Sequence, residues 1–169
     1  KARARARGRR VGGGGAPAAD SRRAMWEFAK IEELLAAGQA EKAWELASAA
    51  AGQHPEDLEV QFQAASFLGG QGLAEGLDPQ RRQGLLEKAE AHYQAALRLG
   101  LEAARLRQAH LGLARGLCAL GRPAEALAAF DAGLERFPDA WELRVFKATA
   151  LCQLGRHEEA VPALLAALA

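Results

Sequence analysis

The chain has 169 residues, of which 50% are hydrophobic, and a formal net charge of +1 at pH 7. This length is enough for one domain with its own core. No stretch reaches the roughly 18 consecutive apolar residues of a membrane span, and no apolar signal-peptide core lies near the start. Two cysteines without a CxxC pair favour a reduced compartment, so we expect a cytoplasmic protein with no membrane partner.

Residues 1–24 differ in composition from the rest of the chain. They carry eight basic side chains and one acid, which leaves 14 basic and 20 acidic residues in the remainder. The acidic remainder disfavours nucleic acid as a partner of the folded part. Because this Arg-, Ala- and Gly-rich run cannot bury a core, we expect a disordered leader or linker, with Met25 as the natural start. Three interpretations stay open: a basic tail for anionic partners, an organelle transit segment, and sequence that is not native to the domain.

The remainder of the chain predicts an all-α protein. Ala, Leu, Glu, Arg and Gln dominate, while the β-branched residues are scarce. Apolar residues recur at three-to-four spacing, which is typical of helices that bury one face. The pattern predicts eight helices in four pairs, at about 23–37 and 41–52, 57–69 and 79–99, 103–120 and 123–136, 140–154 and 157–168.

Glycine and proline mark the ends of these helices. Gly38, Gly121 and Gly155 are placed to end the first helix of a pair in a left-handed conformation. Pro55 and Pro138 are placed to end the second helix, because proline cannot continue the hydrogen-bond ladder.

Two further prolines concern single helices. Asp78-Pro79 is typical of an N-cap followed by proline at the first helical position, after an expected loop at 69–79. Pro162 falls near the sixth position of the last helix, where we expect a kink or a late start.

The chain contains an internal repeat of 34 residues. Residues 107–134 laid over 141–168 give eleven identities. An upstream copy appears at a shift of 83, where five small or proline residues align with the second-helix region of 107–140: Gly38, Ala43, Ala47, Ala50 and Pro55. The second helix of the remaining copy contains Ala89, Tyr93 and Ala96.

The run Ala126, Phe130, Gly133 and Pro138 resembles the second helix of the tetratricopeptide repeat (TPR), a 34-residue helix–turn–helix unit. The hairpin Leu-Gly-Arg-x-x-Glu-Ala at residues 154–160 is similar to that of small bacterial TPR proteins. The resemblance covers residues 25–169 and implies a right-handed α-solenoid of about four helix pairs. The implied repeats are about 24–57, 58–106 with the loop insertion 69–79, 107–140 and 141–169.

The sequence contains no catalytic constellation. The histidines form no metal-spaced pair, and no serine lies in a GxSxG context. Gly69-Gly70-Gln71-Gly72 lacks the Lys-Ser/Thr that completes a phosphate loop. Cys118 and Cys152 occupy the same repeat position on first helices about 8–10 Å apart, so we predict free thiols packed as small hydrophobes. We therefore expect no enzyme activity, no metal and no cofactor.

The TPR resemblance implies a binding groove lined by the first helix of each pair. The residues at groove positions are Phe28, Glu32, Leu35, Phe62, Ser66, Leu111, Arg115, Val145, Thr149 and Gln153. An apolar stripe with a few polar groups suits a bound helix or an extended peptide, although some of these residues are equally suited to packing between helices. The basic and amide clamp of chaperone-binding TPR proteins is not matched, because its places carry Phe28, Glu32, Gln63, Gln108 and Gly112.

The last predicted helix has no polar face along residues 161–169. A terminal repeat needs a polar outer side for solubility. Either more chain follows, or a partner or a second copy covers the residues Val161, Leu164, Leu165 and Leu168. A homodimer through this helix is thus one of the expected arrangements.

These observations predict a protein–protein interaction scaffold or adaptor that binds a peptide or partner protein in its groove. The alternative is an organelle-targeted or nucleic-acid-associated protein that acts through the Arg-rich tail, and salt-dependent binding would support it.

Overall fold

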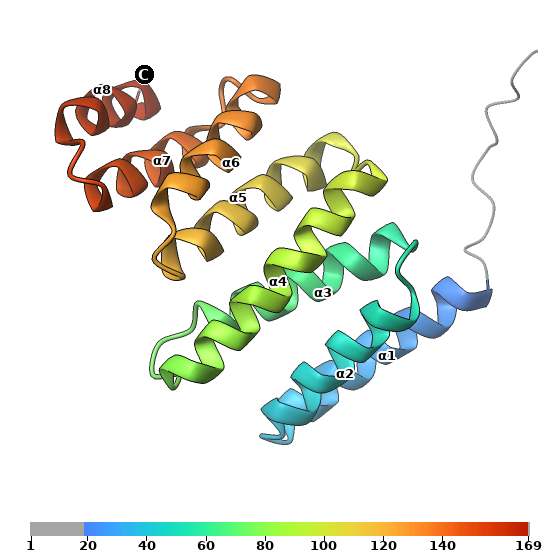
Figure 1. The fold of residues 1–169 in the computed structure, drawn as a ribbon. Helices are drawn as coiled ribbons and strands as arrows, with labels where there is room; N and C mark the ends of the chain where they lie inside the picture. Colours follow the sequence, from blue (N-terminus) through green and yellow to red (C-terminus); the bar gives the residue numbers. More distant parts are fainter. Residues whose placement is uncertain (1–18, 169) are drawn as a thin grey trace, which may run out of the picture.

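The fold is an all-helical stack. The computed structural model describes the backbone of residues 19–168 and the side chains of residues 28–168, and this part contains helices and no strand. The leader was expected over residues 1–24, but residues 19–24 belong to the first helix, Ala19–Ala36. The rest of this expectation and the tail interactions lie outside the described residues. The eight helices are α1 (Ala19–Ala36), α2 (Ala40–Gln53), α3 (Leu58–Gly72), α4 (Pro79–Leu99), α5 (Ala103–Ala119), α6 (Pro123–Arg136), α7 (Trp141–Gln153) and α8 (His157–Leu168) (Figure 1).

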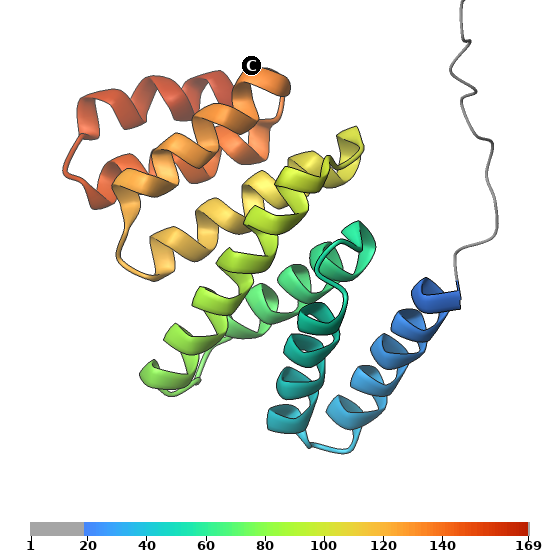
Figure 2. The same cartoon turned by 45° about the vertical axis from the view of Figure 1, so that its right-hand side comes forward.

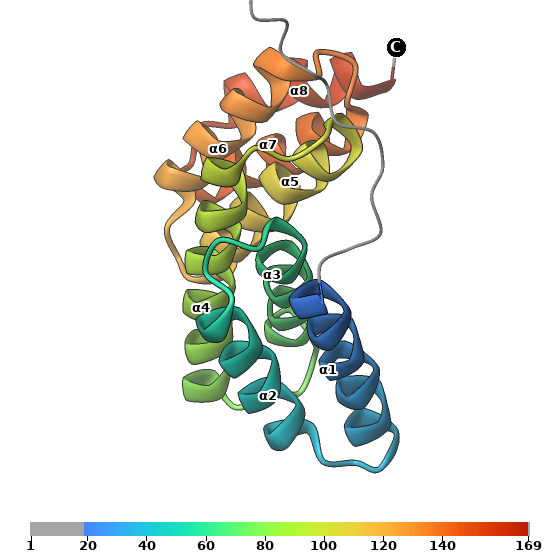
Figure 3. The same ribbon diagram turned by 90° about the vertical axis from the view of Figure 1, so that its right-hand side faces the viewer.

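Consecutive helices pack as hairpins, and the hairpins stack in chain order (Figures 1 and 2). Contacts join α1 to α3, α3 to α5 and α5 to α7, whereas among the second helices of the pairs only α2 and α4 come into contact. In a curved stack the inner layer is the one whose members approach each other, so α1, α3, α5 and α7 form the inner layer. Figure 3 shows α2, α4 and α6 on the other side of the stack. The predicted all-α solenoid of four pairs is confirmed.

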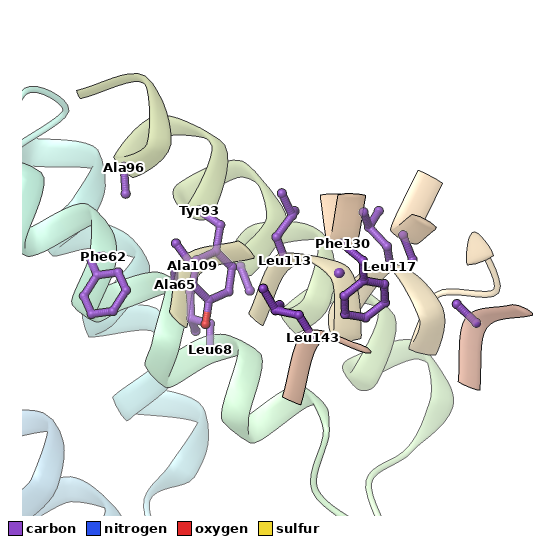
Figure 4. Close-up of a cluster of buried hydrophobic side chains, with 14 of the residues drawn as sticks. Phe62, Ala65, Leu68, Tyr93, Ala96, Ala109, Leu113, Leu117, Phe130 and Leu143 are labelled. Atoms are coloured by element: carbon purple, nitrogen blue, oxygen red, sulfur yellow. The ribbon is translucent and has the colours of Figure 1, made fainter. Parts of the chain in front are cut away.

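One hydrophobic cluster runs through the stack from Ile31 to Ala160. Small residues let the paired helices approach, and Ala43, Ala126 and Ala160 are all buried. Figure 4 shows the ring of Tyr93 among side chains of α3 and α5, and the ring of Phe130 beside those of α5 and α7. Each hairpin therefore buries its apolar residues against its neighbours, as expected for a repeat protein.

The turns within three of the hairpins contain the left-handed glycines that the sequence predicted. Gly38, Gly121 and Gly155 have φ values of 70°, 72° and 72°. At the second of these turns the Arg122 N–H donates to the Leu117 carbonyl oxygen over 2.9 Å, which is the six-to-one bond of a Schellman motif.

The predicted loop at 69–79 is too long. Helix α3 continues to Gly72, and the connection covers residues 73–78. The glycines are positions of close helix approach: a Cβ on Gly69 would lie 3.5 Å from the Ala89 Cβ, and one on Gly72 would lie 2.8 Å from Leu86. Sequence alone could not separate this use of glycine from loop flexibility.

The predictions for the two prolines Pro79 and Pro162 had different outcomes. Asp78 caps α4 as predicted, because its carboxylate accepts from the Gln80 N–H over 3.1 Å, and Pro79 begins the helix. Helix α8 begins at His157 and runs through Pro162, so the late start expected there was wrong. Pro162 has no N–H to donate to the Glu158 carbonyl oxygen, and the helix continues past it without this bond. No helix in the described part is long and apolar enough to cross a membrane.

Candidate functional site

The ten residues expected at the groove all lie on helices of the inner layer. Five of them are exposed and polar: Glu32, Ser66, Arg115, Thr149 and Gln153. Four are half-buried and apolar: Phe28, Leu35, Leu111 and Val145. The inner layer thus presents polar side chains beside partly covered apolar ones.

Phe62 is the exception among the ten. Its side chain is only 8% exposed, and it belongs to the hydrophobic core. The Arg105 guanidinium covers its ring at 5.8 Å from the centroid. Phe62 therefore packs between helices although it stands at a groove position of the repeat. Packing between helices was the alternative that the sequence pattern left open for these residues.

Three of the expected groove residues, Arg115, Thr149 and Gln153, come together at a pocket between α5 and α7. Its volume is about 210 Å³. We call it the α5–α7 pocket, and its remaining lining residues are Leu73, Cys118, Ala119, Phe130 and Phe146. Small-molecule sites usually measure about 300–1,000 Å³, so this pocket has the size for one amino-acid side chain.

Arginines on α5 contact both neighbouring helices of the inner layer. Arg105 lies over Phe62 of α3, and Arg115 lies over Phe146 of α7 with its guanidinium carbon 4.7 Å from the ring centroid. Arg105 is also paired with the Glu59 carboxylate. Among residues 28–168 no salt bridge joins Arg115 to an acid, so its charge is available to a ligand.

Tyr93 of α4 reaches between α3 and α5 toward the inner layer. A Cβ on Gly69 would lie 3.5 Å from its ring, and one on Gly112 would overlap its ring and hydroxyl. Burial raises the pKa of the phenol, although the Ser66 side chain and the charge of Arg115 act in the opposite direction. The polar groups near Arg115 therefore include a phenol that stays protonated at neutral pH.

Sequence reasoning missed several lining residues of the α5–α7 pocket. Phe146 stands 34 residues after Gly112, so the two share a repeat position. The replacement of glycine by an aromatic residue at this position was the signal in the sequence that could have indicated Phe146 as a lining residue. Leu73 follows the end of α3, outside the repeat register, and no sequence signal could have placed it in the pocket.

The cysteines and histidines are spread over several helices and one connection of the described part. Both thiols are free, but only Cys118 is half-buried, whereas Cys152 is exposed, which corrects the expectation that both pack as small hydrophobes. Burial raises the pKa of the Cys118 thiol, which therefore stays protonated. The His92 Nδ1 lies 2.9 Å from the Gln61 Oε1 in a helix interface. No group of three His, Cys, Asp or Glu residues among those described is placed to hold a metal ion.

Larger cavities in the described part of the chain lie away from the α5–α7 pocket. One of about 450 Å³ is lined by the 73–78 connection, the start of α4 and the α5–α6 turn. Arg122 in its wall is already paired with Glu90 and Glu125, each over 2.6 Å. The other, of about 480 Å³, lies between the end of α2 and α4.

Helix α8 exposes the apolar residues that were expected to be an interface. Val161, Leu164, Leu165 and Leu168 are 58%, 42%, 63% and 86% exposed. At the repeat position of Leu164, 34 residues earlier, Phe130 is 0% exposed because the next helix pair covers it. Val161 corresponds in the same way to Leu127, which is 8% exposed, so Val161 and Leu164 occupy stacking positions without a covering helix in the described part of the chain.

A two-layered stack of helix hairpins with a 34-residue repeat defines a helical-repeat protein. The family model described as tetratrico peptide repeat matches residues 81–169, which is more than half of the chain. The chain belongs to the tetratricopeptide repeat family.

Solved structures of MamA share this fold. The structure "MamA MSR-1 C2" superposes with a TM-score of 0.67 at 18% identity, covering 89% of this chain and 78% of that one. A MamA mutant gives a TM-score of 0.64 at 18% identity, covering 89% of this chain and 79% of that one. At this identity the likeness concerns the fold alone. No curated protein matches the sequence.

Proposed function

We propose that this protein is an interaction scaffold that holds a peptide or a segment of a partner protein against its inner layer. The α5–α7 pocket carries the proposal, because an apolar cavity lies there beside the exposed side chains of Arg115, Thr149 and Gln153. An apolar pocket supplies affinity, and the polar groups around it fix the position of the bound chain.

The shape and surface of the stack support this proposal. The first helices approach one another and form the inner side of the curve. Half-buried apolar residues such as Leu111 and Val145 alternate there with exposed polar ones such as Ser66. The curvature of a solenoid creates an extended inner surface of this kind for a ligand.

A charged, bulky side chain on the inner layer should weaken peptide binding. The full chain is immobilised and used to select binders from a random dodecapeptide phage library, and the enriched peptides are tested against two variants. Ser66→Arg places an arginine on α3 of the inner layer, and we expect binding to fall at least about tenfold. The control Ala49→Arg places the same side chain at an exposed small residue of α2, outside the inner layer, and it should bind as the unchanged chain does.

Circular dichroism and thermal unfolding must first show that both variants fold. Enriched peptides that bind Ser66→Arg as well as they bind the unchanged chain would remove the inner layer as the binding site.

A second copy of the chain is a further candidate partner, and the exposed face of α8 supports it. The four residues Val161, Leu164, Leu165 and Leu168 would bury apolar surface in a symmetric contact. We expect light scattering to give the mass of a dimer for the full chain. Leu165→Glu should restore the monomer, while the control Ala128→Glu, at an exposed position of α6, should leave the dimer intact. A mass of one chain that does not change with concentration would exclude the dimer.

A further inference from the structure

We propose that the α5–α7 pocket selects an internal peptide segment in which an apolar residue stands within two positions of an aspartate or glutamate. The apolar side chain enters the pocket, and the carboxylate pairs with Arg115. This inference rests on the proposed function and names the chemistry of its ligand.

The lining of the pocket favours an apolar group. Its walls include Leu73, Ala119, Phe130 and Phe146. Of the two phenylalanines in the lining, Phe130 is 0% exposed and Phe146 is half-buried. At about 210 Å³, the space matches one side chain of leucine or phenylalanine size, and burial of such a side chain is favourable.

The positive charge of Arg115 at the pocket favours a carboxylate as its partner. The Arg115 guanidinium carbon lies 4.7 Å from the centre of the Phe146 ring, which holds the cation at the rim. The other arginine that stacks on a phenylalanine in this layer, Arg105, is neutralised by Glu59. An arginine that stacks on an aromatic ring and lacks an acidic partner offers its free N–H groups to a carboxylate of the ligand.

The charges along the inner layer fix where the acid of the peptide lies. Glu32 is exposed on α1 and repels a carboxylate, and the Arg105 guanidinium beside α3 is already occupied by Glu59. Arg115 lies on α5, nearer the other end of the layer. The acidic residue of the peptide is therefore placed at α5 and α7.

The pocket lies toward the C-terminal ends of two inner helices. Ala119 and Gln153 in its lining are the last residues of α5 and α7, and Arg115 and Thr149 lie one turn before them. Phe146 contributes both to the pocket wall and to the ring beneath Arg115, so the apolar group and the carboxylate must come from residues close in sequence. An internal acidic side chain meets this requirement and lets the peptide continue on both sides.

The test uses the peptides enriched on the full chain from the random dodecapeptide library. We expect them to share an apolar residue within two positions of Asp or Glu. Each is then synthesised with an acetylated N-terminus and an amidated C-terminus, and its Kd for the full chain is measured by fluorescence anisotropy. Changing the acid of the peptide to its amide should weaken binding about fivefold, and Arg115→Gln should do the same. Combining the two changes should weaken binding no further, because both remove one ion pair.

Arg107→Gln is the matched control, since Arg107 is exposed on the same helix but does not line the pocket. Enriched peptides without the acid, or a Kd that Arg115→Gln leaves unchanged, would overturn the inference. So would peptides that bind only with a free C-terminal carboxylate. If peptides with any of these three behaviours still bind Ser66→Arg more weakly than the unchanged chain, the proposed scaffold function stands and only the ligand chemistry fails. If none responds to Ser66→Arg, the proposed function fails with it.

Discussion

Truncation of Leu143 to alanine should lower the free energy of unfolding by about 2–5 kcal/mol. Leu143 is 0% exposed in the first turn of α7, and its side chain packs against Gly133 of α6, where an added Cβ would lie 2.9 Å from its Cδ1. The loss combines the transfer free energy of the removed atoms with the cavity left between two helix pairs. Urea unfolding followed by far-ultraviolet circular dichroism measures it.

The same truncation at an exposed leucine is the control. Leu168 of α8 is 86% exposed, so Leu168→Ala should change the free energy of unfolding by less than about 0.5 kcal/mol in dilute, monomeric protein. Because repeats are stabilised by contacts with their neighbours, hydrogen exchange in Leu143→Ala should rise first in α7 and α8. Equal effects of the two substitutions would show that Leu143 is not a core contact between the pairs.

Two glycines on α5, one turn apart, should respond to alanine with opposite signs. A Cβ on Gly112 would lie 2.9 Å from the Tyr93 Cε2 and overlap the hydroxyl of the same ring. We expect Gly112→Ala to lower the free energy of unfolding by about 1–3 kcal/mol through overpacking. On Gly116 the nearest side-chain atom to a new Cβ is 3.8 Å away, so Gly116→Ala should stabilise the chain by up to about 1 kcal/mol through its helix propensity.

Thermal and urea unfolding of the two variants give these signs directly. In a Tyr93→Leu background the shorter side chain makes room at position 112, and Gly112→Ala should then lose most of its destabilising effect. A destabilisation that persists in that background would show that the ring of Tyr93 is not the obstacle.

The fold could be predicted because its signals are local in the sequence. Eleven identities at a shift of 34 define the repeat, and Gly38, Gly121 and Gly155 mark the hairpin turns with the positive φ that glycine adopts most readily. Asp78 and Pro79 marked the start of α4 in the same way. The turn and cap signals each depend on a few neighbouring residues, so the helix bounds followed within a few positions.

The candidate site was predicted only in part. The repeat register placed Arg115, Thr149 and Gln153 on the inner layer, where they line the pocket. The same register placed Phe62 in the groove, although it is buried. Register determines which way a helix position faces, but the neighbouring helices determine how much of its side chain stays uncovered.

The sequence by itself determined the helices, their pairing and the stacking of the pairs, because a hairpin with one apolar face can bury it only against another hairpin. The tertiary structure alone decided how closely the helices approach. Because the helices lie close together, Gly69 and Gly72 of α3 pack against α4, and the ring of Tyr93 reaches Gly112. The tertiary structure also formed the pocket from the end of α3 and from α5, α6 and α7, because a cavity is set by side chains that are distant in sequence and leave no local signal.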